Sequence, residues 1–132
     1  MTELFSEKWA QEYMVAWNTN EDITDTLASV GWSSIVGFGF KDDEKPAFVM
    51  SISNGHIVSV NQVGVNDLDW DLRATEENWH SLIAKPPGLM KLGMAYTSRK
   101  LRFVKGDYAS MIKDSNLASA FVKSFALMAA IS

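Results

Sequence analysis

Large aromatic side chains recur at helical spacing near the start of the chain. Phe5, Trp9, Tyr13 and Trp17 stand four residues apart, which places them along one side of a helix. The pattern predicts a helix over residues 1–18. Its aromatic stripe is expected either to face the core or to form a wall over an apolar cavity.

A short second helix is expected directly after the first. Thr19 and Asp22 have the spacing of a capping box, and Gly31 supplies the stop signal.

The middle of the chain changes to the two-residue period of β-strands. Four segments predict a meander, at residues 34–40, 47–53, 56–63 and 67–74. Asn54-Gly55, between the second and third segments, is a sequence typical of a two-residue hairpin.

Alternation assigns faces to two of these strands. In the first, Val36, Phe38 and Phe40 point one way, and Gly37 and Gly39 leave room on the other face for a packed helix or a ligand. In the fourth, the pattern predicts a core face of Leu68, Trp70, Leu72 and Ala74 and a solvent face of Asp67, Asp69, Asp71 and Arg73. These aspartates do not match a calcium loop, because Leu72 stands where that loop requires glycine.

Helical signals return after the fourth strand. Thr75 precedes one helix, and Pro87 is expected to open the next, “GLMKLGMAY”. A fifth strand, “KLRFV”, ends at Gly106, and Asp107 is expected to cap the short helix “YASMIK”.

The last predicted helix is apolar on nearly every side. It runs over “NLASAFVKSFALMAAIS” from a cap at Ser115 or Asn116, and Lys123 is its only charged residue. It is too short to span a bilayer. We expect the rest of the core, a ligand, a partner subunit or a membrane surface to cover it.

Composition indicates one globular domain, residues 1–132, with 47% hydrophobic residues. The absence of cysteine excludes disulfides, thiol chemistry and cysteine zinc sites. Charges within the first thirteen residues argue against a secretory signal, so a cytoplasmic location is expected.

Charge is distributed unevenly. The net charge of −4 argues against nucleic acid as a partner. Residues 1–84 carry 4 basic and 14 acidic side chains, whereas residues 85–132 carry 8 basic and 2 acidic ones. The basic part is interpreted as an ordinary solvated face, or as a weak attraction to anionic head groups, including transient contact with a membrane surface, or to an acidic partner.

Motifs of catalysis and cofactor binding are not found. The Gly-x-Ser-x-Gly frame, the phosphate loop and the three-glycine dinucleotide turn are all missing. His56 follows a hairpin and His80 stands alone on a helix, so no metal site is expected. We therefore expect no cofactor, no metal and no catalytic residue.

Four segments carry a family resemblance. They are “FGFKDDEKPAFVMSISNGHI”, “DLDWDLRATEENWHSLI”, “KPPGLMKLGMAY” and “SRKLRFVKGD”. They combine opening strands and a hairpin, a strand followed by a helix, a proline-containing link, and a basic-apolar strand ending in Gly-Asp. In this order, over residues 33–125, they resemble the sterol carrier protein type-two (SCP-2) family of small lipid-binding domains.

The resemblance implies an α+β fold, with a five-stranded, largely antiparallel sheet and helices packed on one side. It also implies an apolar tunnel for a fatty acyl chain, an acyl thioester or a sterol-like molecule, closed by the C-terminal helix. The expected lining residues are Trp70, Trp79, Met90, Met94, Phe103, Phe121, Phe125 and Met128, with Trp9 and Trp17 as additions. Arg99, Lys100 and Arg102 are head-group candidates, although their alternation prevents all three from serving together.

The expected function is therefore non-catalytic carriage of a lipid or other apolar small molecule. One alternative is a small cavity enzyme, such as an isomerase, cyclase or dehydratase, with His80 or Asp107 as the titratable group. Another is an interaction module that forms a homodimer, or docks on a partner, through the C-terminal helix.

Overall fold

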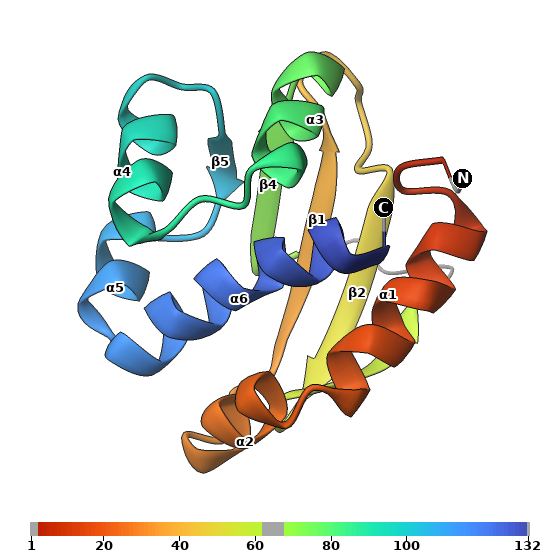
Figure 1. The fold of residues 1–132 in the computed structure, drawn as a ribbon, viewed down its shortest axis with the longest axis vertical. Helices are drawn as coiled ribbons and strands as arrows, with labels where there is room; N and C mark the ends of the chain where they lie inside the picture. Colours follow the sequence, from red (N-terminus) through yellow and green to blue (C-terminus); the bar gives the residue numbers. More distant parts are fainter. Residues whose placement is uncertain (1–2, 62–67, 132) are drawn as a thin grey trace.

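The computed structural model describes residues 3–61 and 68–131. The predicted end of the third strand, residues 62–63, and the predicted solvent-facing Asp67 lie outside them. Within these ranges the chain forms a sheet covered by helices (Figure 1).

Five strands form one mixed sheet in the order β3-β2-β1-β4-β5. They are β1 (Ser34–Phe40), β2 (Phe48–Ser53), β3 (His56–Val60), β4 (Trp70–Ala74) and β5 (Arg102–Lys105). Neighbouring strands run antiparallel, except that β1 and β4 are parallel. The predicted α+β class with a largely antiparallel sheet is confirmed.

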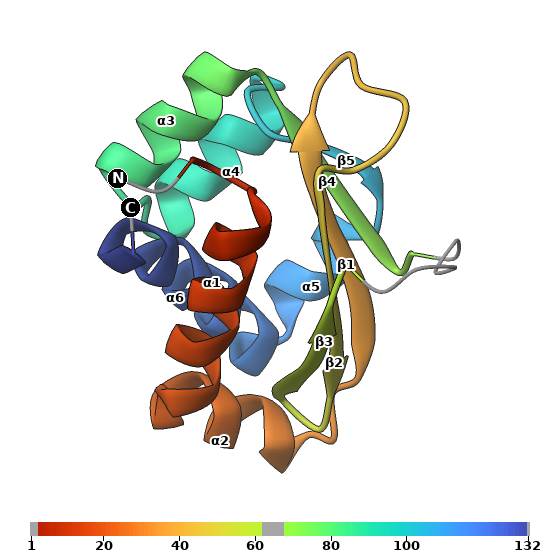
Figure 2. The ribbon, with the colours of Figure 1, turned by 90° about the vertical axis from the view of Figure 1, so that its right-hand side faces the viewer.

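The described helices all lie on one face of this sheet, which is the inner face (Figure 2). They are α1 (Glu7–Thr19), α2 (Glu21–Ser29), α3 (Glu76–Ala84), α4 (Leu89–Thr97), α5 (Tyr108–Lys113) and α6 (Ser115–Ile131). The predicted hairpin at Asn54-Gly55 is confirmed, because both residues have a positive φ, 48° and 85°.

The aromatic stripe of α1 faces the core, and Trp9 and Tyr13 are fully buried. The predicted start of this helix is wrong. Ser6 is the N-cap and accepts a hydrogen bond from the Trp9 amide at 3.2 Å. Phe5 therefore precedes the helix, yet it still packs edge-on against Trp9.

One predicted N-cap is confirmed and two are wrong. Asp107 caps α5 as expected, and Thr75, where helical signals were expected to return, is the N-cap of α3. The predicted Thr19 cap is wrong, because Thr19 ends α1 and Asn20 caps α2 by accepting from the Ile23 amide. A carboxamide one residue later performs the same capping as the predicted hydroxyl.

The starts of α4 and α6 also differ from prediction. Leu89, rather than Pro87, begins α4 after an extended Gly88. At α6 the cap is neither Ser115 nor Asn116. Instead, the Asp114 carboxylate accepts from the Asn116 and Leu117 amides at 3.0 and 3.3 Å.

The prediction that the outer face of β4 is exposed to solvent is wrong. Asp71 and Arg73 point away from the helices as expected, but both are buried. They lie beneath the β1–β2 connection, where Arg73 donates to the carbonyl of Asp43 at 2.6 Å. The same connection explains the β1 glycines, because a Cβ at Gly39 would come within 3.0 Å of Pro46. A loop, rather than a helix or ligand, makes the close approach.

Helix α6 lies in the middle of the helical layer and packs against each of the other five helices. Its buried residues are Ala118, Ala120, Ser124, Phe125, Leu127 and Met128. The protein's own helices therefore cover most sides of this apolar helix, and the remaining side faces the sheet.

Candidate functional site

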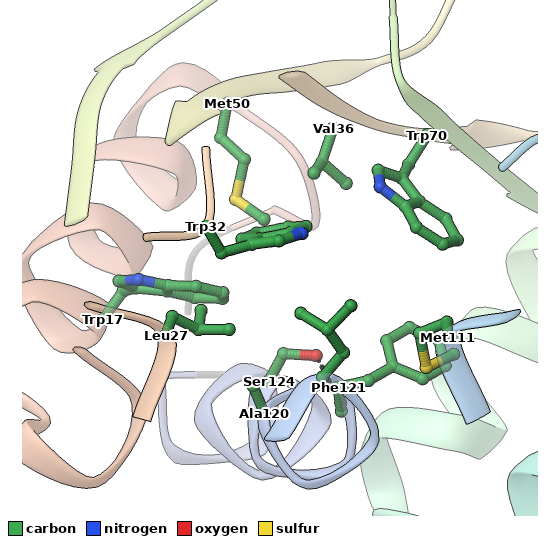
Figure 3. Close-up of a pocket in the computed structure, with 11 residues that line it drawn as sticks. Trp17, Leu27, Trp32, Val36, Met50, Trp70, Met111, Ala120, Phe121 and Ser124 are labelled. Atoms are coloured by element: carbon green, nitrogen blue, oxygen red, sulfur yellow. Dashed lines mark hydrogen bonds between the residues drawn. The ribbon is translucent and has the colours of Figure 1, made fainter. Parts of the chain in front are cut away.

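An apolar cavity lies between the inner face of the sheet and α6 (Figure 3). The centre of a water molecule can move within about 60 Å³ of it. One water needs about 10–15 Å³ on this measure, so the cavity has room for roughly four to six water-sized or methylene-sized groups.

Helices α1, α2, α5 and α6, strands β1, β2 and β4, and the α2–β1 connection contribute to its wall. The lining residues are Trp17, Leu27, Trp32, Val36, Met50, Trp70, Met111, Leu117, Ala120, Phe121 and Ser124. In Figure 3 the strand residues Val36, Met50 and Trp70 lie opposite the α6 residues Ala120, Phe121 and Ser124. The cavity is therefore a gap in the packing of α6 against the sheet.

Burial separates the inner wall from the mouth. Val36, Met50, Met111 and Ala120 are buried. The lining residues that are only half-buried are Trp32, Trp70, Leu117 and Phe121. We infer that the mouth lies at these half-buried residues.

Backbone hydrogen bonds fix the part of the wall nearest α2. The Trp17 Nε1–H donates to the Gly55 carbonyl at 2.8 Å. Trp32 is held at both backbone groups, because its amide donates to the Leu27 carbonyl and its carbonyl accepts from the Gly55 amide. Gly55 is required here, since a Cβ would come within 2.7 Å of the Thr24 carbonyl oxygen. The hairpin turn thus positions two tryptophans of the site.

Gly106 positions the third tryptophan. It has a φ of 105°, and a Cβ at this position would overlap the ring of Trp70. Trp70 also packs edge-on against Phe103, with ring centroids 6.1 Å apart. The glycine at the end of β5 therefore allows the indole of β4 to occupy the wall.

The polar groups of α6 in this wall are already hydrogen-bonded. Ser124 donates its hydroxyl to the Phe121 carbonyl. Its own carbonyl accepts from the Tyr13 hydroxyl at 3.0 Å. Burial raises the pKa of the Tyr13 phenol, so this hydroxyl stays protonated and continues to donate. The described lining contains no charged side chain.

The predicted lining residues lie in three different parts of the structure: the cavity wall, the solid core and the surface. Trp17, Trp70 and Phe121 line the cavity. Trp9, Trp79, Phe125 and Met128 are fully buried core residues, and the ring of Trp79 stacks on that of Phe125 at 6.3 Å. Phe103 is half-buried beside Trp70. Met90 and Met94 are on the surface, 83% and 64% exposed.

The head-group candidates also lie away from the cavity. Arg99 and Arg102 line one surface hollow, and Lys100 lines another. The three do not share one hollow, but strand alternation is not the reason, because β5 begins only at Arg102 and both Arg99 and Lys100 precede it.

The groups named for the enzyme alternative are outside the cavity. His80 is exposed, and its Nε2 lies 3.7 Å from a Glu76 oxygen. Asp107 caps α5 at the surface, where hydrogen bonds from Ser110 hold the pKa of its carboxyl below the usual range.

Residues 3–61 and 68–131 contain neither a metal-binding cluster nor a membrane-spanning helix. No group of three His, Cys, Asp or Glu side chains there is arranged to hold a metal ion. None of the helices in these ranges has the length and hydropathy to cross a membrane.

Several cavity residues have no signal of their own in the sequence. Val36 shares a predicted strand face with Phe38, and Leu27 and Met50 fall within a predicted helix and a predicted strand. Neither kind of position distinguishes a cavity wall from solid core. Trp32 stands between the second helix and the first strand, where no periodicity applies. A tryptophan next to the helix-stopping Gly31 is the one cue that could have marked it.

Comparisons with known proteins identify the fold. No protein-family model and no curated protein sequence matches this chain. Among solved structures, a sterol carrier protein 2 superposes with a TM-score of 0.76 at 20% identity, covering 98% of this chain and 100% of the other. A conserved hypothetical protein of Thermus thermophilus, with a suggested sterol carrier identity, gives 0.74 at 19% identity, covering 100% and 92%.

A third solved structure, the ubiquinone synthesis protein UbiJ-SCP2, gives a TM-score of 0.62 at 15% identity, covering 97% of this chain and 91% of the other. At these identities the comparisons establish the fold, which is that of the sterol carrier protein 2 structures. The predicted SCP-2 resemblance is confirmed at this level.

Proposed function

We propose that this protein, which has the SCP-2 fold, binds and carries a lipid or other apolar small molecule. The observation that carries the proposal is the apolar cavity between the sheet and α6, whose lining includes Met50, Met111 and Phe121. The names of the similar structures refer to sterol carriage and to ubiquinone synthesis. Fatty acyl chains, acyl thioesters and sterol-like molecules are the proposed cargo.

The cavity is too small for a whole lipid chain, so tight binding requires it to enlarge. Burying four to six methylene groups at about 0.8 kcal/mol each gives a favourable transfer free energy of roughly 3–5 kcal/mol. As a binding free energy, this corresponds to a dissociation constant of about 1 mM. A longer chain needs more room. Met50 and Met111 line the buried wall, and their flexible thioether side chains can change rotamer to provide it.

Carriage is proposed ahead of catalysis. General acid-base chemistry needs a titratable group within reach of the substrate, and His80 and Asp107 lie at the surface. The homodimer alternative depended on an uncovered C-terminal helix, and α6 packs against the other five helices.

Cargo exchange is proposed to occur at an anionic membrane surface through the exposed face of α4. Leu89, Met90 and Met94 project there. Hollows on either side of α4 are lined by Lys85, Lys91, Lys100, Lys113 and Lys123, with no acidic side chain among their described lining residues. Apolar side chains within a ring of lysines complement a surface of anionic lipids, where each lysine contributes about 1 kcal/mol.

Native mass spectrometry of the gently purified protein tests the proposal. We expect a population whose excess mass equals that of a lipid, identified after extraction. We also expect a long-chain lipid to be taken up by the stripped protein. Ligand-free masses from several expression hosts, together with no uptake by the stripped protein, would overturn the proposal.

A further inference from the structure

The mouth of the cavity carries two tryptophan N–H groups that donate to no acceptor in the described part of the chain. Trp17 and Trp79 donate their Nε1–H groups to backbone carbonyls at 2.8 and 2.7 Å. Within residues 3–61 and 68–131, Trp32 and Trp70 have no such acceptor for theirs. Buried indole N–H groups normally find a partner within the protein. The N–H groups of the half-buried Trp32 and Trp70 are instead free to donate to water, or to an oxygen of a ligand that displaces that water.

Both groups reach open space. Every fully buried side-chain nitrogen or oxygen in the described part of the chain has a hydrogen-bond partner. The Trp32 and Trp70 N–H groups have none, so both must be at least partly exposed to solvent. In Figure 3 the nitrogen of Trp32 and the nitrogen of Trp70 lie on ring edges that face one another across the upper part of the cavity. Both rings line the cavity and are half-buried.

The protein restricts both tryptophans before any ligand arrives. The backbone of Trp32 is held by hydrogen bonds to Leu27 and Gly55. Trp70 is confined between Gly106 and Phe103. A donor that is already oriented loses little entropy on binding an acceptor.

The absence of charged side chains around the cavity favours an uncharged hydrogen-bond acceptor on the ligand. None of the described lining residues is charged, and the head-group candidates Arg99, Lys100 and Arg102 line other hollows. A carboxylate at this mouth would lose hydration without gaining a counter-charge. A ketone, ester or alcohol oxygen loses less hydration and accepts the same hydrogen bond.

We propose that Trp32 and Trp70, whose indole N–H groups have no acceptor among residues 3–61 and 68–131, form a hydrogen-bonding site at the cavity mouth that selects amphiphiles with an uncharged oxygen acceptor at the polar end. This inference rests on the proposed binding function and narrows its ligand class. The apolar tail lies towards Met50 and Ala120, and the oxygen lies between the two indoles.

The test compares octane, 2-octanone and octanoate as ligands of the stripped protein. We expect 2-octanone to bind more tightly than either of the others, by about threefold to tenfold for each hydrogen bond gained. In ¹H–¹⁵N spectra, 2-octanone should shift the indole N–H signals of Trp32 and Trp70 downfield. The signals of Trp17 and Trp79, whose N–H groups are already donated, should move less.

Trp32→Phe keeps an aromatic ring and removes the donor. It should lower the affinity for 2-octanone more than that for octane, so that the ratio of the two affinities separates loss of the donor from a change in cavity shape. Trp70→Phe repeats the test on the other side of the mouth. The indole N–H shifts are measured on the wild-type protein, so they test the site even if both variants fail to fold.

The outcomes separate the two proposals. If 2-octanone binds no more tightly than octane or octanoate, or if the indole signals do not move, this site is overturned while the binding function stands. Binding of none of the three, together with no uptake of a longer lipid, overturns both.

Discussion

Arg73 Nε lies 2.7 Å from Asp71 Oδ1 on the outer face of the sheet, with the side chains 7% and 9% exposed. The guanidinium also donates to the carbonyls of Phe40 and Asp43, at 3.2 and 2.6 Å. One arginine therefore ties β4 to the end of β1 and to the connection that follows it. The pair holds the strands whose opposite faces bear Val36 and Trp70 of the cavity.

Removing one member of this pair should destabilise the fold. Arg73→Met leaves the Asp71 carboxylate buried without its partner, so we expect a loss of about 3–5 kcal/mol in the free energy of unfolding, measured by urea denaturation. The double variant Asp71→Leu/Arg73→Met removes both charges and should recover most of that loss. A single variant as stable as the wild type would contradict the role assigned to the pair.

Gly106→Ala should disturb the cavity from outside it. The new Cβ overlaps the Trp70 ring, and the φ of 105° is unfavourable for alanine. We expect a loss of at least about 1 kcal/mol of stability, accompanied by changed tryptophan fluorescence. Gly88→Ala is the matched control, because a Cβ there meets nothing within 4 Å. Equal effects at both glycines would show that Trp70 is not held in this way.

Ala120→Leu should block ligand binding without unfolding the protein. Ala120 lines the buried wall, and its enlargement by three carbon atoms fills much of a cavity of about 60 Å³. We expect lipid uptake to fall by roughly tenfold or more, since about two methylene sites are lost to the ligand. Ala126→Leu, at an exposed position of the same helix, should bind as the wild type does. Unimpaired uptake by Ala120→Leu would place the ligand elsewhere.

Charge reversal beside α4 should weaken membrane attachment. The triple variant Lys85→Glu/Lys91→Glu/Lys100→Glu should bind phosphatidylserine-containing vesicles at least about a hundredfold more weakly than the wild type in a co-sedimentation assay, because three lysines at about 1 kcal/mol each are lost. Lys8→Glu/Lys41→Glu/Lys45→Glu changes the net charge equally at exposed sites and tests for a non-specific effect. If both triple variants lose binding to the same extent, the α4 face is not the docking surface.

The Asp107 cap should make part of the stability depend on pH. Hydrogen bonds from Ser110 hold the pKa of Asp107 below its ordinary value of 3.8. The folded state therefore favours the ionised carboxyl, which gives stability that is complete at neutral pH and lost as the pH falls through the folded-state pKa.

Asp107→Asn keeps a good capping group that does not titrate. Between about pH 6 and about pH 3, the wild type should therefore lose more stability than this variant, measured as the shift in the urea midpoint. Parallel pH profiles would argue against the cap as the titrating group.

The sequence correctly predicted those turns, caps and strand faces that depend only on residues adjacent in the chain. The Asn54-Gly55 hairpin, the Asp107 cap and the inward face of β1 all follow from a few adjacent positions. Errors of one or two residues occurred where two side chains compete to cap, as Thr19 and Asn20 do at α2. The site was recovered only in part, because Trp17, Trp70 and Phe121 line the cavity whereas Trp9 and Trp79 are in solid core.

By itself, the sequence determined the order of the helices and strands and which faces of them are apolar, because periodicity is a property of neighbouring residues. It did not determine what covers those faces. Only the tertiary structure showed that the β1–β2 connection buries Asp71 and Arg73, and that α6 leaves a gap against the sheet beside Trp32 and Trp70. Whether an apolar face meets packed side chains or a cavity depends on how segments far apart in the chain fit together, and alternation along one strand carries no information about that fit.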